Sequence, residues 1–106
     1  MLRSALNRAY YAMFYAVLAL LATSRTDTSR HSGAISLFDR EFVKPGTLPQ
    51  DFSRWLHDGF NERQDADYGV DFGRTVEDAS ESVHRARQFV AGARDWLQRQ
   101  GHLPAV

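Results

Sequence analysis

The chain has 106 residues, carries 13 Lys and Arg against 13 Asp and Glu, and contains no cysteine. This length accommodates one domain but not two, and the lack of cysteine excludes disulfides, thiol catalysis and thiolate zinc sites. The zero net charge provides no overall field toward nucleic acid or an anionic membrane. We expect a single domain at residues 1–100 and a flexible tail at 101–106, in a reducing cytoplasm.

An apolar segment near the start predicts a helix from about Leu2 to Ala22. Its apolar residues nearly encircle the helix from Ala9 onward, which indicates a central helix touched on several sides. Three tyrosines interrupt the segment, and its uncharged part is shorter than the roughly 20 residues that a bilayer span needs. We therefore expect a buried core helix, with neither a signal peptide nor a membrane association.

Two shorter helices follow after a polar loop at residues 23–30. The first is expected to begin with Ser29 or Ser32 as N-cap and to end at Pro45–Gly46. Its predicted core residues are Ile35, Phe38 and Phe42. The next helix should begin at Pro49, run to about Asp65 and be terminated by Tyr68–Gly69.

The last helix has the clearest pattern. Thr75 and Asp78 form an N-terminal capping signature, and small apolar residues then recur at alternating spacings of three and four. This seam comprises Val76, Ala79, Val83, Ala86, Val90, Ala93 and Leu97. It predicts antiparallel packing, and together the segments predict an all-α, four-helix, up-and-down bundle.

Arg63 stands out because it falls on the same helical stripe as Phe52, Leu56 and Phe60. A permanent positive charge there is costly unless a partner or a ligand compensates it. Two interpretations stay open at this point. Arg63 either serves a function or forms a buried ion pair with Asp65, Asp67 or an acid on a neighbouring helix.

Three stretches of the chain carry a family resemblance. Residues 7–15 (NRAYYAMFY), 30–35 (RHSGAI) and 63–68 (RQDADY) are similar, in this order, to the signature stretches of a bacterial and archaeal branch of the HEPN superfamily. The similarity covers roughly residues 5–100 and implies a HEPN-like helical bundle. Relatives usually begin with another amphipathic helix, so we expect this version to lack the family's first helix. Either the recorded start is internal or the protein is shortened.

The resemblance also implies a function. Many HEPN proteins are metal-independent endoribonucleases that carry Arg, four to six residues, then His, in a symmetric dimer, and they often act as toxins beside a minimal nucleotidyltransferase antitoxin. Arg63 matches the family's arginine, but the positions allowed for the histidine hold Tyr68, Gly69 and Val70. A phenol, whose ordinary pKa is about 10, is a poor general base at neutral pH. The motif is therefore a degenerate Arg-x4-Tyr with Arg63 and Tyr68 as catalytic candidates.

Four further residues are candidates for contacts with substrate or phosphate: Arg8, Tyr11, His31 and Asp67. His31 could cap its helix or approach Arg63. We expect no cofactor and no metal. The run from Asp65 to Asp71 fails the calcium-loop template, because glycine stands fifth rather than sixth and Val76 occupies the twelfth position.

Two functional hypotheses follow. The first is a toxin-like RNA endonuclease centred on Arg63. The alternative is a non-catalytic helical module that partners a nucleotidyltransferase or binds nucleotide. In both cases we expect a homodimer, because the first helix has apolar surface that no helix of its own chain covers.

Overall fold

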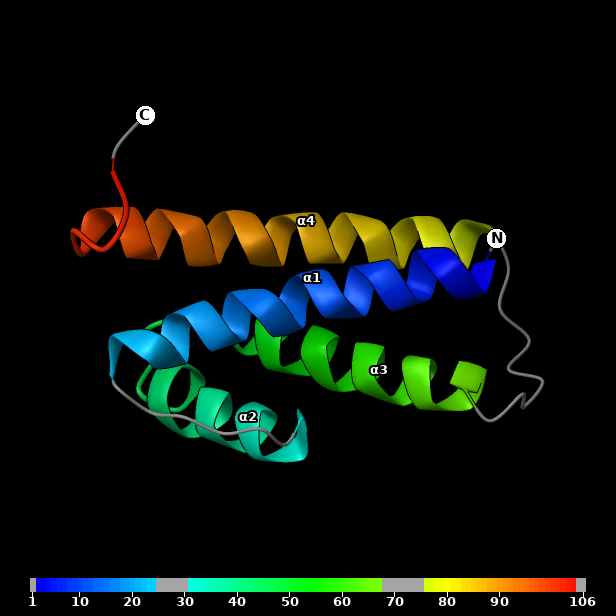
Figure 1. Ribbon diagram of the computed structural model, residues 1–106, viewed down its shortest axis with the longest axis horizontal. Coiled ribbons are helices and arrows are strands. Elements are labelled where there is room, and N and C mark those ends of the chain that lie inside the picture. The colour runs from blue at the N-terminus through cyan, green and yellow to red at the C-terminus, as the bar shows by residue number, and fades with distance from the viewer. Residues whose placement is uncertain (1, 25–30, 68–75, 105–106) are drawn as a thin grey trace.

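The computed structural model describes residues 2–24, 31–67 and 76–104, and these form helices and short turns without any strand. The helices are α1 (Leu2–Thr23), α2 (His31–Phe38), α3 (Gln50–Asp67) and α4 (Val76–Arg99), with a π-helical segment η1 (Asp39–Val43) continuing α2. Figure 1 shows all four α-helices in one bundle. The prediction of an all-α four-helix bundle is confirmed.

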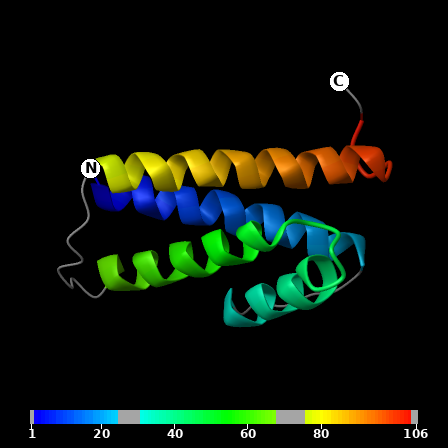
Figure 2. The same ribbon diagram turned by 180° about the vertical axis from the view of Figure 1, so that it is seen from behind.

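The directions of the helices differ in part from the expected order. α1, α2 and α4 run one way and α3 runs the other way, as seen from both sides in Figures 1 and 2. The predicted antiparallel packing of α4 therefore holds for its contact with α3 but not for its contact with α1. The spacing of apolar residues could not predict this, because it identifies the buried face of a helix but not the direction of the helix relative to its neighbours.

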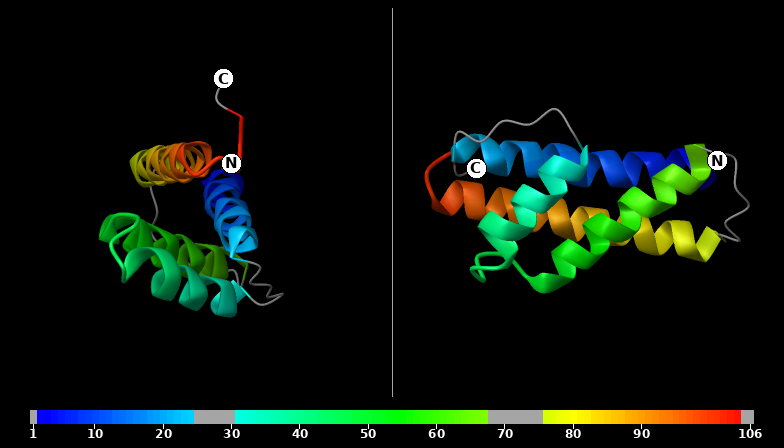
Figure 3. Two further views of the ribbon diagram at one scale, coloured as in Figure 1. Left: turned by 90° about the vertical axis from the view of Figure 1, so that its left-hand side faces the viewer. Right: turned by 90° about the horizontal axis from the view of Figure 1, so that it is seen from below.

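α1 is the central helix, as its encircling apolar residues predict. It has α4 on one side and α2 with α3 on the other (Figure 3), and Tyr10, Val17 and Leu20 are completely buried. By length and composition residues 3–23 could cross a membrane, yet 44% of the most apolar stretch is buried inside the bundle. The helix contacts α2, α3 and α4, as a core helix of a bundle does.

The helix ends refine the predictions. α2 already includes Ser32, so this residue is not the N-cap, and Ser29 lies outside the described residues. Ile35, Phe38 and Phe42 are buried as predicted. The π-helical segment was not predicted; the Lys44 amide donates to the Asp39 carbonyl at 2.8 Å there. The proposed end at Tyr68–Gly69 and the Thr75 cap lie outside the described residues.

α4 buries most of its predicted seam, including Ala79, Ala86, Ala93 and Leu97. Val76 is an exception, since 68% of its surface is exposed. The reason is that Val76 borders an open groove beside α1 rather than a packed interface.

A glycine cap ends α4. The Gly101 and His102 amides donate to the Gln98 and Leu97 carbonyls at 3.1 and 2.8 Å, and Gly101 has φ +80°. This is a Schellman motif, in which glycine adopts the left-handed conformation without a steric penalty. The segment that follows the predicted domain boundary thus begins with a defined cap.

Candidate functional site

Arg63 lies on the α3 face that also carries the buried residues Phe52 and Leu56, as its helical phase predicts, and its side chain is half-buried. Its guanidinium carbon is 5.3 Å from the centroid of the Tyr11 ring on α1. A cation above an aromatic face is attracted by the negative charge of the ring face. α1 thus provides part of the environment that this charge requires.

His31, the first residue of α2, lies in the same place. Its Nδ1 is 2.8 Å from the Tyr10 hydroxyl oxygen. Its ring stacks on Phe14 with centroids 4.0 Å apart and meets the Tyr11 ring edge-on at 5.8 Å. We call Tyr10, Tyr11, Phe14, His31 and Arg63 the His31 cluster. α1, α2 and α3 all contribute to it.

The cluster keeps His31 neutral. Burial is the larger cause that lowers the pKa of His31, and the positive charge of Arg63 lowers it further. Burial raises the pKa of Tyr10 to about 12; Arg63 opposes this rise and Tyr11 adds to it. At neutral pH the Tyr10–His31 pair therefore consists of a hydroxyl and an uncharged imidazole. Which of the two donates depends on the tautomer of the ring.

A glycine on α3 sets how closely that helix approaches the cluster. A Cβ atom at Gly59 would lie 2.9 Å from Met13 Cε and 3.4 Å from Tyr10 Cδ1. These distances are at or below the limit of ordinary carbon contacts. The missing side chain lets α3 pack directly against the ring that binds His31.

The structure brings together three of the six predicted site residues, namely Arg63, Tyr11 and His31. Arg8 lies elsewhere and lines a groove between α1 and α4. Asp67 is the last residue of α3, but its side chain is not described, and Tyr68 lies outside the described residues.

Tyr10 was not among the predicted site residues. One feature of the sequence could have identified it: a buried tyrosine needs a partner for its hydroxyl, and Tyr10 lies inside an apolar segment.

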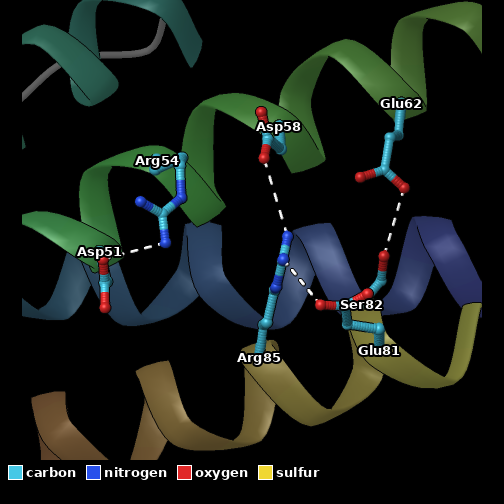
Figure 4. Close-up of polar contacts among 7 residues, drawn as sticks. All are labelled: Asp51, Arg54, Asp58, Glu62, Glu81, Ser82 and Arg85. Carbon is cyan, nitrogen blue, oxygen red and sulfur yellow. Dashed lines mark hydrogen bonds and ion pairs between the residues drawn. The ribbon is translucent and has the colours of Figure 1, made fainter. Parts of the chain in front are cut away.

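A second polar network joins α3 to α4 and has a structural role (Figure 4). Arg85 pairs with Asp58 at 3.7 Å and with Glu81 at 2.7 Å, and Ser82 donates to Glu62 at 3.2 Å. Glu62 is only 9% exposed, and sequence reasoning did not single it out. No group of three or more potential metal ligands occurs among the residues that the structure describes.

His57 forms a separate pair with Asp39, with 2.8 Å between Nε2 and Oδ2. Its side chain is 52% exposed. His57 is therefore outside the His31 cluster.

Comparison with known proteins matches residues 1–96 to the HEPN domain. The chain belongs to the HEPN domain family. This HEPN domain is 33% identical to "Putative toxin MJ0142" of Methanocaldococcus jannaschii over 88% of the chain and 63% of the relative. It is 37% identical to "UPF0332 protein" of Thermotoga maritima over 99% of the chain and 70% of the relative. No solved structure matches.

A second relative in Methanocaldococcus jannaschii, "Putative toxin MJ0605", is 36% identical over 83% of the chain and 65% of its own length. The HEPN domain thus spans about two thirds of the length of these relatives. The predicted family is confirmed, and the names of two relatives connect it with toxins.

Proposed function

We propose that this HEPN domain is a toxin-like, metal-independent endoribonuclease of the cytoplasm. Arg63 binds the scissile phosphate, and His31 acts as the general base in place of the histidine that the family motif carries after its arginine. One observation carries the proposal: His31 and Arg63, on different helices, both contact the Tyr11 ring. The cation and the imidazole that the chemistry needs are thus neighbours, although the sequence separates them.

The proposed reaction is an attack by the ribose on its own phosphate. A nitrogen of neutral His31 takes the proton of the 2′-hydroxyl, and the 2′-oxygen forms a bond to phosphorus. The bond from phosphorus to the 5′-oxygen breaks, and the protonated imidazole returns its proton to this leaving oxygen. The products are a 2′,3′-cyclic phosphate and a 5′-hydroxyl. Arg63 stabilises the negative charge that develops on the phosphate oxygens.

The electrostatics of the cluster suit this role. A general base must be unprotonated before the reaction, and burial together with Arg63 lowers the pKa of His31. For Nε2 to take the substrate's proton, the proton of the neutral ring must be on Nδ1, which then donates a hydrogen bond to the Tyr10 hydroxyl oxygen. When the ring is protonated, Nδ1–H can donate to Tyr10. Tyr10 is thus a positioning residue that keeps its own proton, since its pKa is about 12.

The assembly is a further part of the proposal. Tyr15 is 63% exposed and its ring centroid is 6.1 Å from that of Tyr11, so an aromatic surface extends from the cluster to solvent. We place the seam of a homodimer there. Asp67 and Tyr68, four and five positions after Arg63 in the sequence, stay candidate residues of the site. The toxin names of two relatives support an antitoxin partner in general. The family resemblance implies that this antitoxin is a minimal nucleotidyltransferase.

One observation favours the alternative, a binding module without catalysis. Tyr68, Gly69 and Val70 stand where the motif expects histidine. In this alternative, Arg63 and the Tyr11 ring hold the phosphate of a nucleotide or of RNA and no bond is broken.

Incubation with end-labelled RNA in EDTA tests the proposal. The wild type should cleave and leave 2′,3′-cyclic phosphate ends. Arg63→Ala and His31→Asn should each reduce the rate about a hundredfold or more. Asparagine can keep a polar atom near the position of Nδ1, so the bond to Tyr10 is retained while Nε2 is lost. His84→Asn, at an exposed position of α4, is the matched control and should cleave like the wild type.

Three results would contradict it. Intact RNA with both the wild type and Tyr68→His would favour the binding module. Unchanged cleavage by a folded His31→Asn variant would remove His31 from the mechanism. Cleavage that EDTA abolishes would contradict both hypotheses.

A further inference from the structure

The two halves of α3 meet α4 through different kinds of contact. In the first half, Phe52 stacks on Phe89 of α4 with ring centroids 4.8 Å apart. A Cβ atom at Gly92 would lie only 2.6 Å from Phe52 Cζ, so the two helices approach each other closely there. Close packing of apolar groups therefore fixes the first half of α3 against α4.

The second half of α3 meets α4 through polar side chains (Figure 4). Arg85 of α4 reaches Asp58 at 3.7 Å, and one turn farther along α3 Ser82 donates a hydrogen bond to Glu62 Oε2 at 3.2 Å. The Asp58 side chain is 49% exposed, whereas Glu62 is only 9% exposed. An exposed ion pair contributes little stability, but a buried carboxylate requires its hydrogen bonds. The contact of Glu62 with α4 is therefore the one on which this half of α3 depends more.

Glu62 and Arg63 are neighbours in sequence, and their side chains point to different helices. Glu62 meets Ser82 of α4, whereas the Arg63 guanidinium carbon lies 5.3 Å from the centroid of the Tyr11 ring on α1. Successive residues of an α-helix are about 100° apart around its axis. Because the helix backbone links the two side chains, a rotation that breaks the contact with α4 also shifts the guanidinium on the other side.

We infer that Glu62 is a positioning residue for Arg63. Its buried hydrogen bond with Ser82 sets the rotation of the second half of α3, and this rotation holds the guanidinium over the Tyr11 ring. The importance of this position for cleavage rests on the proposed function, in which Arg63 binds the scissile phosphate. A misplacement of about 1 Å can reduce the rate of a reaction on the order of a hundredfold. Glu62 itself acts through Arg63 and contacts no substrate.

The pKa of His31 reports the position of Arg63. Burial is the larger cause that lowers this pKa, and the positive charge of Arg63 lowers it further. If Glu62→Ala releases Arg63 from its place, the pKa of His31 rises. Loss of the negative charge of Glu62 would by itself lower the pKa of His31, because a carboxylate favours the protonated imidazole. The direction of the change thus separates an effect on position from an effect of charge.

NMR titration of the full-length protein measures the pKa of His31 in each variant. Glu62→Ala should raise it above the wild-type value. Glu62→Gln keeps the shape of the side chain and an acceptor oxygen for Ser82, so it should not raise the pKa. Asp58→Ala is the matched control, because it removes an acid one turn earlier on the same side of α3, and it should not raise the pKa either. In a protein that already carries Arg63→Ala, adding Glu62→Ala should no longer raise the pKa.

Cleavage of end-labelled RNA in EDTA provides the second measurement. Glu62→Ala should lower kcat/KM at least about tenfold, because the cation no longer meets the charge that develops on the phosphate. Glu62→Gln should stay within about threefold of the wild type, since it keeps the contact with Ser82. Far-ultraviolet circular dichroism at the assay temperature verifies that each variant is folded.

The two measurements separate this inference from the proposed function. A raised pKa of His31 in folded Glu62→Ala supports the positioning role, even where the wild type leaves RNA intact and the nuclease is rejected. An unchanged or lowered pKa in folded Glu62→Ala overturns the inference, even where the wild type cleaves RNA. If Glu62→Ala does not fold, Ser82→Ala takes its place, because it removes the same hydrogen bond and keeps the acid. It should also raise the pKa of His31, and an unchanged value would overturn the inference.

Discussion

The two sides of α1 provide different surroundings for arginine side chains. On the side facing α2 and α3, Arg63 lies over the Tyr11 ring, within a set of stacked aromatic rings. On the side facing α4, Arg87 and Arg94 border a hollow lined by alanine and valine. Aromatic residues on the first side of α1 fill the space between helices, and alanines on the second side leave it open. The first side surrounds its charge with aromatic rings, and the second leaves Arg87 and Arg94 exposed.

The largest expected effect concerns packing. Phe14 is 7% exposed and stacks on His31, so Phe14→Ala should lower the free energy of unfolding by about 3–5 kcal/mol. Val90 is half-buried and lies between α1 and α4, so Val90→Ala should lower the free energy of unfolding by only about 1 kcal/mol. Urea denaturation of both variants measures the difference. Equal losses would show that the two sides of α1 are equally closed.

The next effect concerns assembly. At micromolar concentration the wild type should sediment as a dimer. Tyr15→Glu should weaken the dimer at least about tenfold, because the new charge would be buried at the seam. Asn61→Glu, at an exposed position of α3 beside α4, provides a control for added surface charge. A wild type that is monomeric at all concentrations would exclude the proposed homodimer.

The smallest expected effect is a dependence of stability on pH. His31 has a lowered pKa in the folded protein, so the unfolded chain binds the proton more readily. The contribution of neutral His31 to the free energy of unfolding is fully present above the ordinary histidine pKa of about 6.5. This contribution is lost as the pH falls from that value through the lowered pKa of His31 in the folded protein. Between pH 7.5 and pH 5, the urea midpoint of the wild type should fall more than that of His31→Asn. His84→Asn should behave like the wild type. Identical pH profiles for the wild type and His31→Asn would show that the fold does not disfavour the protonated ring.

Local patterns in the sequence predicted much of this architecture. The alternating spacing of α4 identified its buried alanines, and the helical phase of Arg63 placed a charge on the inner face of α3. Both predictions depend only on residues within one helix. Val76 was predicted as buried and is exposed, because its burial depends on a neighbouring helix and not on its own spacing.

The site required information that no single helix contains. Tyr10 and His31 are 21 positions apart, and their hydrogen bond depends on how α2 crosses α1. The position of Arg8 beside α4 likewise depends on packing between helices. The π-helical turn at Asp39–Val43 was also missed, since it is a small deviation in hydrogen bonding that leaves the apolar pattern nearly unchanged.

Gly59 links the packing of α3 to the position of the Tyr10–His31 pair. A Cβ atom there would lie 3.4 Å from Tyr10 Cδ1, and the Tyr10 hydroxyl is hydrogen-bonded to the imidazole of His31. A larger residue at this position would first displace the flexible end of Met13 and would then press on the Tyr10 ring, although it would not itself belong to the His31 cluster. Natural variation at one helix crossing could therefore tune or silence the site while every residue in it stays the same.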